Sequence, residues 1–182
     1  MTLLEVETKI KVSDHAFLKR KLDDLGAVSR GTVMQHDRYF NSPFRDFAET
    51  DEALRIRHEN GVVSVTYKGP KRPSPVGKAR EEVSVMVSSG EKIELILDRL
   101  GFLSVAEVKK RREEFEWRDS VISLDEVEGL GEFVEIEVLS EDAQEQSEKT
   151  IDSVKAVLGI SGPHIPESYL ELVLATRKEA QL

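Results

Sequence analysis

The sequence contains no cysteine, no long apolar run and no excess of positive charge. Without cysteine, disulfide frameworks, zinc–thiolate sites and cysteine nucleophiles are excluded. No apolar stretch is long enough to span a bilayer or resembles a signal peptide, so we expect a cytoplasmic protein with no membrane partner. The formal net charge of −9 argues against a general nucleic-acid-binding surface.

The 182 residues suit one medium domain with a real core, so we predict a single domain over residues 1–182. Apolar periodicity and turn residues predict eight strands, mostly joined by hairpins, at about residues 4–10, 27–40, 53–57, 62–68, 78–87, 108–117, 121–125 and 133–138. About four helices are expected at residues 13–25, 89–100, 140–158 and 167–177. This order predicts an α+β fold built on an antiparallel sheet.

Two of these strands carry paired acidic residues on one face. In the stretch 4–10, Glu5, Glu7 and Lys9 alternate with apolar residues, and Glu135 and Glu137 do the same near the other end. Like charges at positions i and i+2 repel, and a divalent cation that binds both carboxylates would remove that penalty. The alternative is the solvated outer face of an ordinary amphipathic strand.

The strands between these two carry mostly basic residues on one face. The charged positions are Arg55, Arg57, Lys68, Arg80 with Glu82, Lys109, Arg111 and, on the next strand, Asp125. If the sheet closes with these faces inward, the interior is a polar tunnel that needs a ligand and ions for neutrality. Arginine and lysine suit phosphate oxygens, and paired carboxylates suit Mg²⁺ or Mn²⁺. A polyphosphate that chelates a divalent metal fits both halves.

The order of these motifs resembles the CYTH superfamily, the triphosphate tunnel enzymes. The matching stretches are Glu5-Val6-Glu7-Thr8-Lys9, Asp37-Arg38-Tyr39-Phe40, Leu54-Arg55-Ile56-Arg57, Tyr67-Lys68-Gly69-Pro70, Arg80-Glu81-Glu82, Lys109-Lys110-Arg111, Leu124-Asp125, Gly129-Leu130-Gly131, Glu135-Ile136-Glu137 and Ser168-Tyr169. The chain looks closest to the class IV adenylyl cyclase (CyaB-like) branch. Ser84 departs from the acidic alternation that many relatives continue, which affects the expected tunnel charge on that strand.

The resemblance implies an eight-stranded antiparallel β-barrel, or tunnel, with helices packed outside. It implies that Glu5, Glu7, Glu135 and Glu137 bind Mg²⁺ or Mn²⁺, and that these acids act in catalysis together with Lys9 and Asp125. The triphosphate would be held by Lys9, Arg55, Arg57, Lys68, Arg80, Lys109 and Arg111, with Glu82 as a supporting acid.

Three functions follow from this pattern. A cyclase would convert ATP to cyclic AMP and pyrophosphate, and the resemblance to the CyaB-like branch favours it. A triphosphatase would hydrolyse tripolyphosphate, thiamine triphosphate or a nucleoside triphosphate with similar geometry and metal use. The third is a polyphosphate- or nucleotide-binding module without turnover. A homodimer and the roles of Asp37, Tyr39 and Tyr169 are left open.

Overall fold

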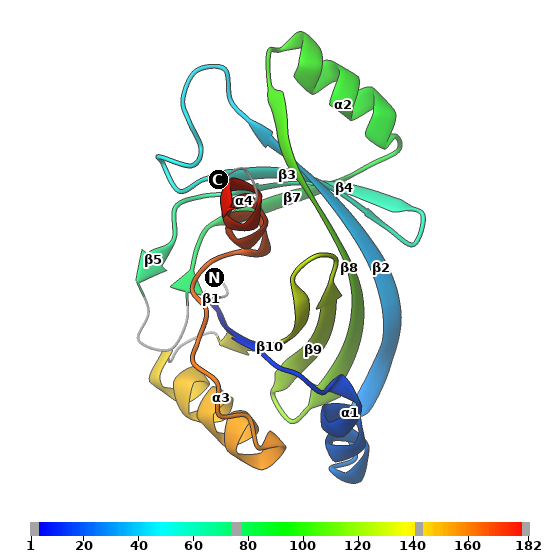
Figure 1. Cartoon of the computed structure of the whole chain (residues 1–182), viewed down its shortest axis with the longest axis vertical. Helices are drawn as coiled ribbons and strands as arrows, with labels where there is room; N and C mark the ends of the chain where they lie inside the picture. The colour runs from blue at the N-terminus through cyan, green and yellow to red at the C-terminus, as the bar shows by residue number, and fades with distance from the viewer. Residues whose placement is uncertain (1–3, 74–77, 141–143, 180–182) are drawn as a thin grey trace. The chain divides into compact units, whose positions relative to one another are not determined.

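The computed structural model describes residues 4–73, 78–140 and 144–179 (Figure 1). Its elements in chain order are β1 (Leu4–Lys11), α1 (His15–Asp24), β2 (Val28–Asn41), β3 (Ala53–Glu59), β4 (Val62–Lys68), β5 (Arg72–Pro73), β6 (Lys78–Ala79), β7 (Glu82–Val87), α2 (Gly90–Arg99), β8 (Leu103–Trp117), β9 (Ser120–Val127), β10 (Gly131–Ser140), α3 (Gln144–Leu158) and α4 (Tyr169–Glu179). None of these described helices is long and apolar enough to cross a bilayer.

The strands form one sheet in the order β5-β6-β1-β10-β9-β8-β2-β3-β4-β7. Every strand pair whose register is resolved is antiparallel. The predicted α+β fold, with eight principal antiparallel strands and four helices, is therefore confirmed. The order is linear in the described residues, with β5 and β7 at its ends.

The chain divides into two compact units, which we describe separately. Unit 1 comprises residues 1–32, 72–79 and 111–166, and unit 2 comprises residues 33–71, 80–110 and 167–182. Strands β2 and β8 contribute residues to both units. The prediction of a single domain remains a prediction.

In unit 1, one face of the sheet packs against α1 and α3. The buried cluster combines strand residues with helix residues: Val6, Ile10, Phe115, Trp117, Ile122, Leu124, Val134, Ile136 and Val138 from the strands, and Leu18, Leu22, Ile151, Val154 and Leu158 from the helices. These strand positions alternate along each strand, so the residues between them project from the opposite face. That opposite face carries Glu7, Lys9, Arg112, Asp125, Glu135 and Glu137.

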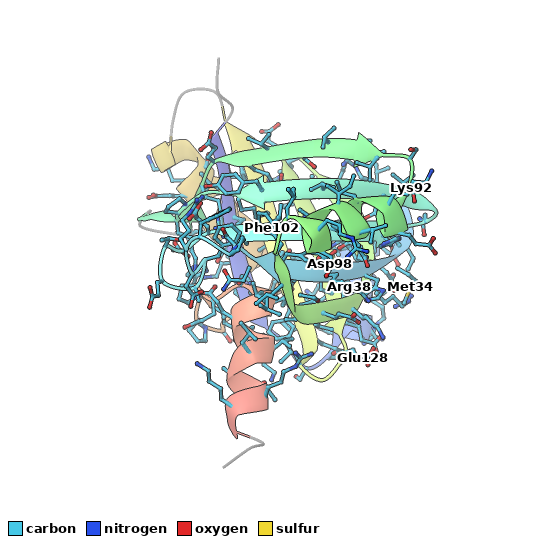
Figure 2. All side chains as sticks on the ribbon, turned by 90° about the horizontal axis from the view of Figure 1, so that it is seen from above. Met34, Arg38, Lys92, Asp98, Phe102 and Glu128 are labelled. Carbon is cyan, nitrogen blue, oxygen red and sulfur yellow. The ribbon has the colours of Figure 1, made fainter. Side chains whose placement is uncertain are left out.

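In unit 2, α2 and α4 lie on opposite sides of β3, β4 and β7 (Figure 1). Phe40 and Ile56 pack with Leu97 of α2 in a second buried cluster. On the same outer side, the Arg38 guanidinium donates to Glu94 of α2 at 2.5 Å (Figure 2). The sheet face turned away from α2 therefore carries the neighbouring residues in each strand, including Asp37, Arg55 and Arg57.

Local signals mostly placed the elements correctly. Asn60 and Gly61 have φ of 47° and 82° in the β3–β4 hairpin, a conformation that Asn-Gly adopts readily. Ser89 caps α2 through the Lys92 amide, whereas Asp14, one residue later than the expected Ser13, caps α1. The continuous strand predicted over 78–87 is wrong, because residues 80 and 81 separate β6 from β7.

Candidate functional site

The charged face of unit 1 is assembled by the register of three strands. Glu7 pairs with Glu137 and Lys9 with Glu135 across β1 and β10, while Phe133 pairs with Asp125 across β10 and β9. Directly paired residues share a face, so the acids expected from the two Glu-x-Glu motifs lie together. The backbone of Glu5 pairs with Leu139, but its side chain lies outside the described part of the structure.

The centre of this face is an ion-pair network around Arg112. Its guanidinium binds Asp125 bidentately, with Nε–Oδ1 at 2.7 Å and Nη2–Oδ2 at 2.6 Å, and Nη2 also donates to Glu135. Lys9 Nζ lies 3.8 Å from the other Glu135 oxygen. Asp125 is fully buried and Lys9 is 2% exposed. Because a buried charge is costly without a partner, this network holds the acidic strands in one arrangement.

Glu7 and Glu137 form the second feature of this face. Burial and the nearby charge of Glu7 raise the pKa of Glu137 above its ordinary value, although Arg112 acts in the opposite direction. Two opposed carboxylates fit Mg²⁺ or Mn²⁺, which proteins commonly bind through one or two carboxylates plus substrate phosphates. Among the described residues, no group of three or more His, Asp or Glu side chains is arranged to hold a metal ion.

The charged face of unit 2 is organised around Asp37. Arg57 binds this carboxylate with Nε–Oδ1 at 2.6 Å and Nη2–Oδ2 at 2.7 Å, and Arg55 Nη1 lies 3.3 Å from Oδ2. Burial opposes ionisation of Asp37, but the Arg57 hydrogen bonds and the charges of Arg55, Arg57 and Lys110 outweigh it and lower its pKa. The structure thus gives Asp37, whose role was open, the task of orienting the arginines.

Arg55 keeps unused donor capacity. Its Nε is buried and has no hydrogen-bond partner among the described residues. A buried N–H without an acceptor costs free energy, and a phosphate oxygen is an acceptor that suits a guanidinium. The prediction that Arg55 and Arg57 lie on the face opposite Leu54 and Ile56 is confirmed, since the latter two pack with the α2 cluster.

Lys68 and Glu82 extend the same face across β4 and β7. Lys68 Nζ lies 2.6 Å from Glu82 Oε2, and the two residues are paired in register. Ser84, where an acid was expected by resemblance, is hydrogen-bonded to Thr66 at 2.9 Å between hydroxyl oxygens. On this face, β7 therefore carries one acid, Glu82, and the next position along the strand is a neutral hydrogen-bonded pair of hydroxyl groups.

Arg80, which was predicted to bind phosphate, donates hydrogen bonds to backbone carbonyl groups in the structure. Its Nε donates to the Gly69 carbonyl at 2.7 Å and its Nη2 to the Asp51 carbonyl at 2.9 Å. These bonds hold the end of β4 and the segment after β6 in place. A role in binding substrate stays a prediction for Arg80.

Strand β8 presents different basic residues from those expected. Lys109 and Arg111 are exposed, and Arg111 pairs with Glu113. Lys110 is 4% exposed and acts on Asp37, while Arg112 holds Asp125. The prediction that Lys109 and Arg111 lie on the charged face is wrong, because the neighbouring residues Lys110 and Arg112 lie there. A role of Lys109 and Arg111 in binding substrate stays a prediction.

A sequence signal for the correct face was available. Phe115 and Trp117 are the apolar residues at the end of β8, and both belong to the unit 1 core. Counting back with a period of two from these residues places Arg112 on the opposite, charged face. A run of four consecutive basic residues hides this register, because either phase puts two cations on each face.

Helix α4 adds Tyr169 to the charged face of unit 2. Lys110 Nζ lies 4.8 Å from the centre of the Tyr169 ring, within the range of a cation–π contact. Lys71 Nζ donates to both oxygens of Glu171 at 2.8 Å, and the Ser168 amide and hydroxyl donate to the same carboxylate. These contacts fix the start of α4 and, with it, the position of Tyr169.

Comparison with known proteins identifies the family. The model of the CYTH domain matches residues 3–169. The chain belongs to the CYTH family. A Methanocaldococcus jannaschii protein provisionally named an adenylate cyclase is 43% identical to this CYTH chain over 174 residues, covering 93% of this chain and 98% of that protein. Adenylate cyclase CyaB of Aeromonas hydrophila is 27% identical over 141 residues, with coverage of 76% and 70% respectively.

Solved structures share the fold of this CYTH protein. The PH1819 protein of Pyrococcus horikoshii superposes with a TM-score of 0.84 at 38% identity, covering 95% of this chain and 99% of that one. A Hippeastrum protein described as an adenylyl cyclase candidate with dominant triphosphatase activity gives a TM-score of 0.75 at 18% identity, covering 96% of each chain. The second likeness shows the fold alone.

Proposed function

We propose that this CYTH protein is a metal-dependent enzyme acting on a triphosphate, and that it converts ATP to cyclic AMP and pyrophosphate in the cytoplasm. The observation that carries the proposal is the separation of charge over two sheet faces, acidic in unit 1 and basic in unit 2. Similarity to relatives named adenylate cyclases favours cyclisation among reactions of triphosphates.

The basic face of unit 2 binds phosphate oxygens in this proposal. Arg55 contributes its spare Nε, Lys68 its ammonium, and Lys110 the charge beside Tyr169. Arg57 already donates two hydrogen bonds to Asp37, which hold its guanidinium in place. Its remaining N–H groups would donate to the phosphate. Charge-assisted contacts of this kind neutralise the phosphates and align them for in-line attack.

The acidic face of unit 1 supplies the metal ligands. Glu7 and Glu137 would hold Mg²⁺ or Mn²⁺ together with the substrate phosphates, and bound metal would supply charge neutralisation and a lowered pKa for the attacking hydroxyl. Glu5 and Glu135 of the same two motifs stay predicted ligands. Arg112 and Lys9 fix the position of Glu135, while Asp125 holds Arg112. Asp125 is therefore a positioning residue in this scheme.

The deciding experiment is product identification. The protein is incubated with ATP and Mg²⁺ or Mn²⁺, and cyclic AMP with pyrophosphate is expected; the same assay is run on tripolyphosphate and thiamine triphosphate. A melting temperature that rises with tripolyphosphate and Mg²⁺ is expected as well, because a bound polyanion relieves repulsion among the cations of unit 2. Triphosphate-induced stabilisation without any product would favour a binding module.

Triphosphate hydrolysis is the second candidate. The Hippeastrum protein shows that this fold can host a dominant triphosphatase activity. Cyclisation and hydrolysis need the same charged groups and differ in the nucleophile, a ribose hydroxyl or water. Release of inorganic phosphate, with ADP rather than cyclic AMP from ATP, would establish this alternative.

A further inference from the structure

We propose that Gln35 and Glu59 form a nucleoside subsite, which accepts hydrogen bonds from an amino or hydroxyl group carried by a nucleoside triphosphate. The inference rests on the proposed function and goes further, because it assigns residues that distinguish a nucleotide from an inorganic triphosphate. All the residues that carry it belong to unit 2.

The first observation is an unused acceptor. Gln35 is 5% exposed, and its Nε2 donates to Glu59 Oε2 at 2.5 Å. That bond fixes the orientation of the amide, because the opposite orientation would set its oxygen against a carboxylate. The Gln35 Oε1 atom is then buried without a donor among the described residues. Such an atom costs free energy unless a ligand or water fills its place.

The second observation is the position of this pair on the sheet. Successive pairs across β2 and β3 are Tyr39 with Arg55, Asp37 with Arg57, and Gln35 with Glu59, all on one face. Two residues along a strand span roughly 7 Å. The face therefore changes within that distance from cationic groups, which suit phosphate, to groups that only accept from a ligand.

The third observation is the chemistry of Glu59. No cation pairs with its carboxylate among the described residues, and its recorded partner is the Gln35 amide. Two acceptor groups without a cation repel phosphate and attract an uncharged donor. Amino groups of a base and hydroxyl groups of a ribose are such donors, and a nucleoside triphosphate carries them next to its phosphates. Inorganic tripolyphosphate carries neither.

The test compares two ligands by calorimetry with Mg²⁺: α,β-methylene-ATP, which cannot be cyclised because its α,β bridge is not an oxygen, and imidotriphosphate, which resists hydrolysis. Gln35→Met keeps the side-chain length and removes the acceptor. We expect it to weaken binding of α,β-methylene-ATP about three- to tenfold, the range of a lost hydrogen bond, and to leave imidotriphosphate affinity unchanged. Glu59→Gln, which keeps a polar side chain, should shift the same ratio in the same direction.

The matched control is Met34→Ala on the same strand. Met34 is 60% exposed and is labelled in Figure 2; by alternation it projects from the face opposite Gln35. This variant should change neither affinity. Analogues of α,β-methylene-ATP without the 6-amino group or without one ribose hydroxyl identify the donor, because Gln35→Met should have no further effect on the affinity of the analogue that lacks it.

Three results would overturn the inference. If Gln35→Met lowers the affinity for both ligands equally, the substitution has a general effect on the fold or its charge. Unchanged α,β-methylene-ATP affinity in both variants, with imidotriphosphate still bound, would make Gln35 a structural residue while the proposed function stands. If the wild type binds neither ligand, the proposed function fails and this inference fails with it.

Discussion

The charged faces of the two units have opposite balances. In unit 1, the acids Glu7, Glu114, Asp125, Glu135 and Glu137 outnumber the cations Lys9, Lys11 and Arg112 among the described residues. In unit 2, the four cations Arg55, Arg57, Lys68 and Lys110 outnumber the three acids Asp37, Glu59 and Glu82 among the described residues. Arg112 and Lys9 in unit 1, and Asp37 and Glu82 in unit 2, each hold charges of the more numerous sign in place. A face of one sign alone would repel itself, so orientation requires the counter-charge.

The largest difference is expected in the free energy of unfolding when the arginine that binds a buried aspartate is removed from each unit. Arg112→Met in unit 1 leaves the fully buried Asp125 without its bidentate partner, and we expect it to lower the free energy of unfolding by about 3–5 kcal/mol. Arg57→Met in unit 2 should cost only about 1–3 kcal/mol, because Asp37 retains Arg55 and Lys110. Urea denaturation of both variants measures the difference.

The control for this comparison is a double variant of unit 1 in which the aspartate left without its arginine is also made uncharged. Arg112→Met combined with Asp125→Asn should recover part of the loss, since an uncharged amide is less costly to bury than a carboxylate. Equal losses for Arg112→Met and Arg57→Met would mean that the two networks support their units in the same way.

The next effect separates the two arginines of unit 2. Arg55→Met should weaken imidotriphosphate binding by about 1.5–3 kcal/mol, because a charge-assisted contact is lost. It should destabilise the fold less than Arg57→Met, because Arg55 makes the longer contact with Asp37, at 3.3 Å. Calorimetry and denaturation are run on both variants. Unchanged affinity in Arg55→Met and in Arg57→Met would remove phosphate binding from this strand.

A smaller effect is expected from the like-charged pair of unit 1. Glu7→Gln removes repulsion opposite Glu137 and should raise the stability of the metal-free protein by up to about 1 kcal/mol, while metal-dependent turnover falls. Because the pKa of Glu137 is raised in the fold, the contribution of Glu137 to stability grows as pH falls from neutral towards that pKa, and this contribution should be smaller in Glu7→Gln. Melting temperatures from pH 7 to pH 4.5 in EDTA check this, and parallel curves would contradict it.

The smallest effect concerns Glu171 of unit 2, whose pKa is lowered in the fold, whereas that of Glu137 is raised. Burial opposes ionisation of Glu171, but hydrogen bonds from Lys71 and Ser168 lower its pKa to about 2 from 4.5. This stabilisation is present above pH 4.5 and is lost as pH falls through about 2. Glu171→Gln should therefore be less stable at pH 6 and should show a flatter decline below pH 4.5. An unchanged decline would show that Lys71 does not hold α4 through this group.

Much of the fold and part of the site could be predicted from residue patterns. Alternation placed Glu7 with Lys9, and Arg55 with Arg57, on their faces because the intervening residues, Thr8 and Ile56, are uncharged. The same rule failed at Lys109 to Arg112, where four cations give no contrast between faces. The reading of residues 78–87 as one strand failed because alternation does not show that Arg80 turns to backbone carbonyls.

The sequence by itself determined the two Glu-x-Glu strands, the hairpin at Asn60-Gly61 and the helix faces, since these depend on neighbours only a few residues apart. Tertiary structure alone decided which charges meet. Arg112 reaches Asp125, Asp37 joins two arginines from another strand, and Gln35 keeps a buried oxygen without a donor. Burial and cross-strand register create those relations, because both depend on residues distant in the chain that approach one another only in the fold.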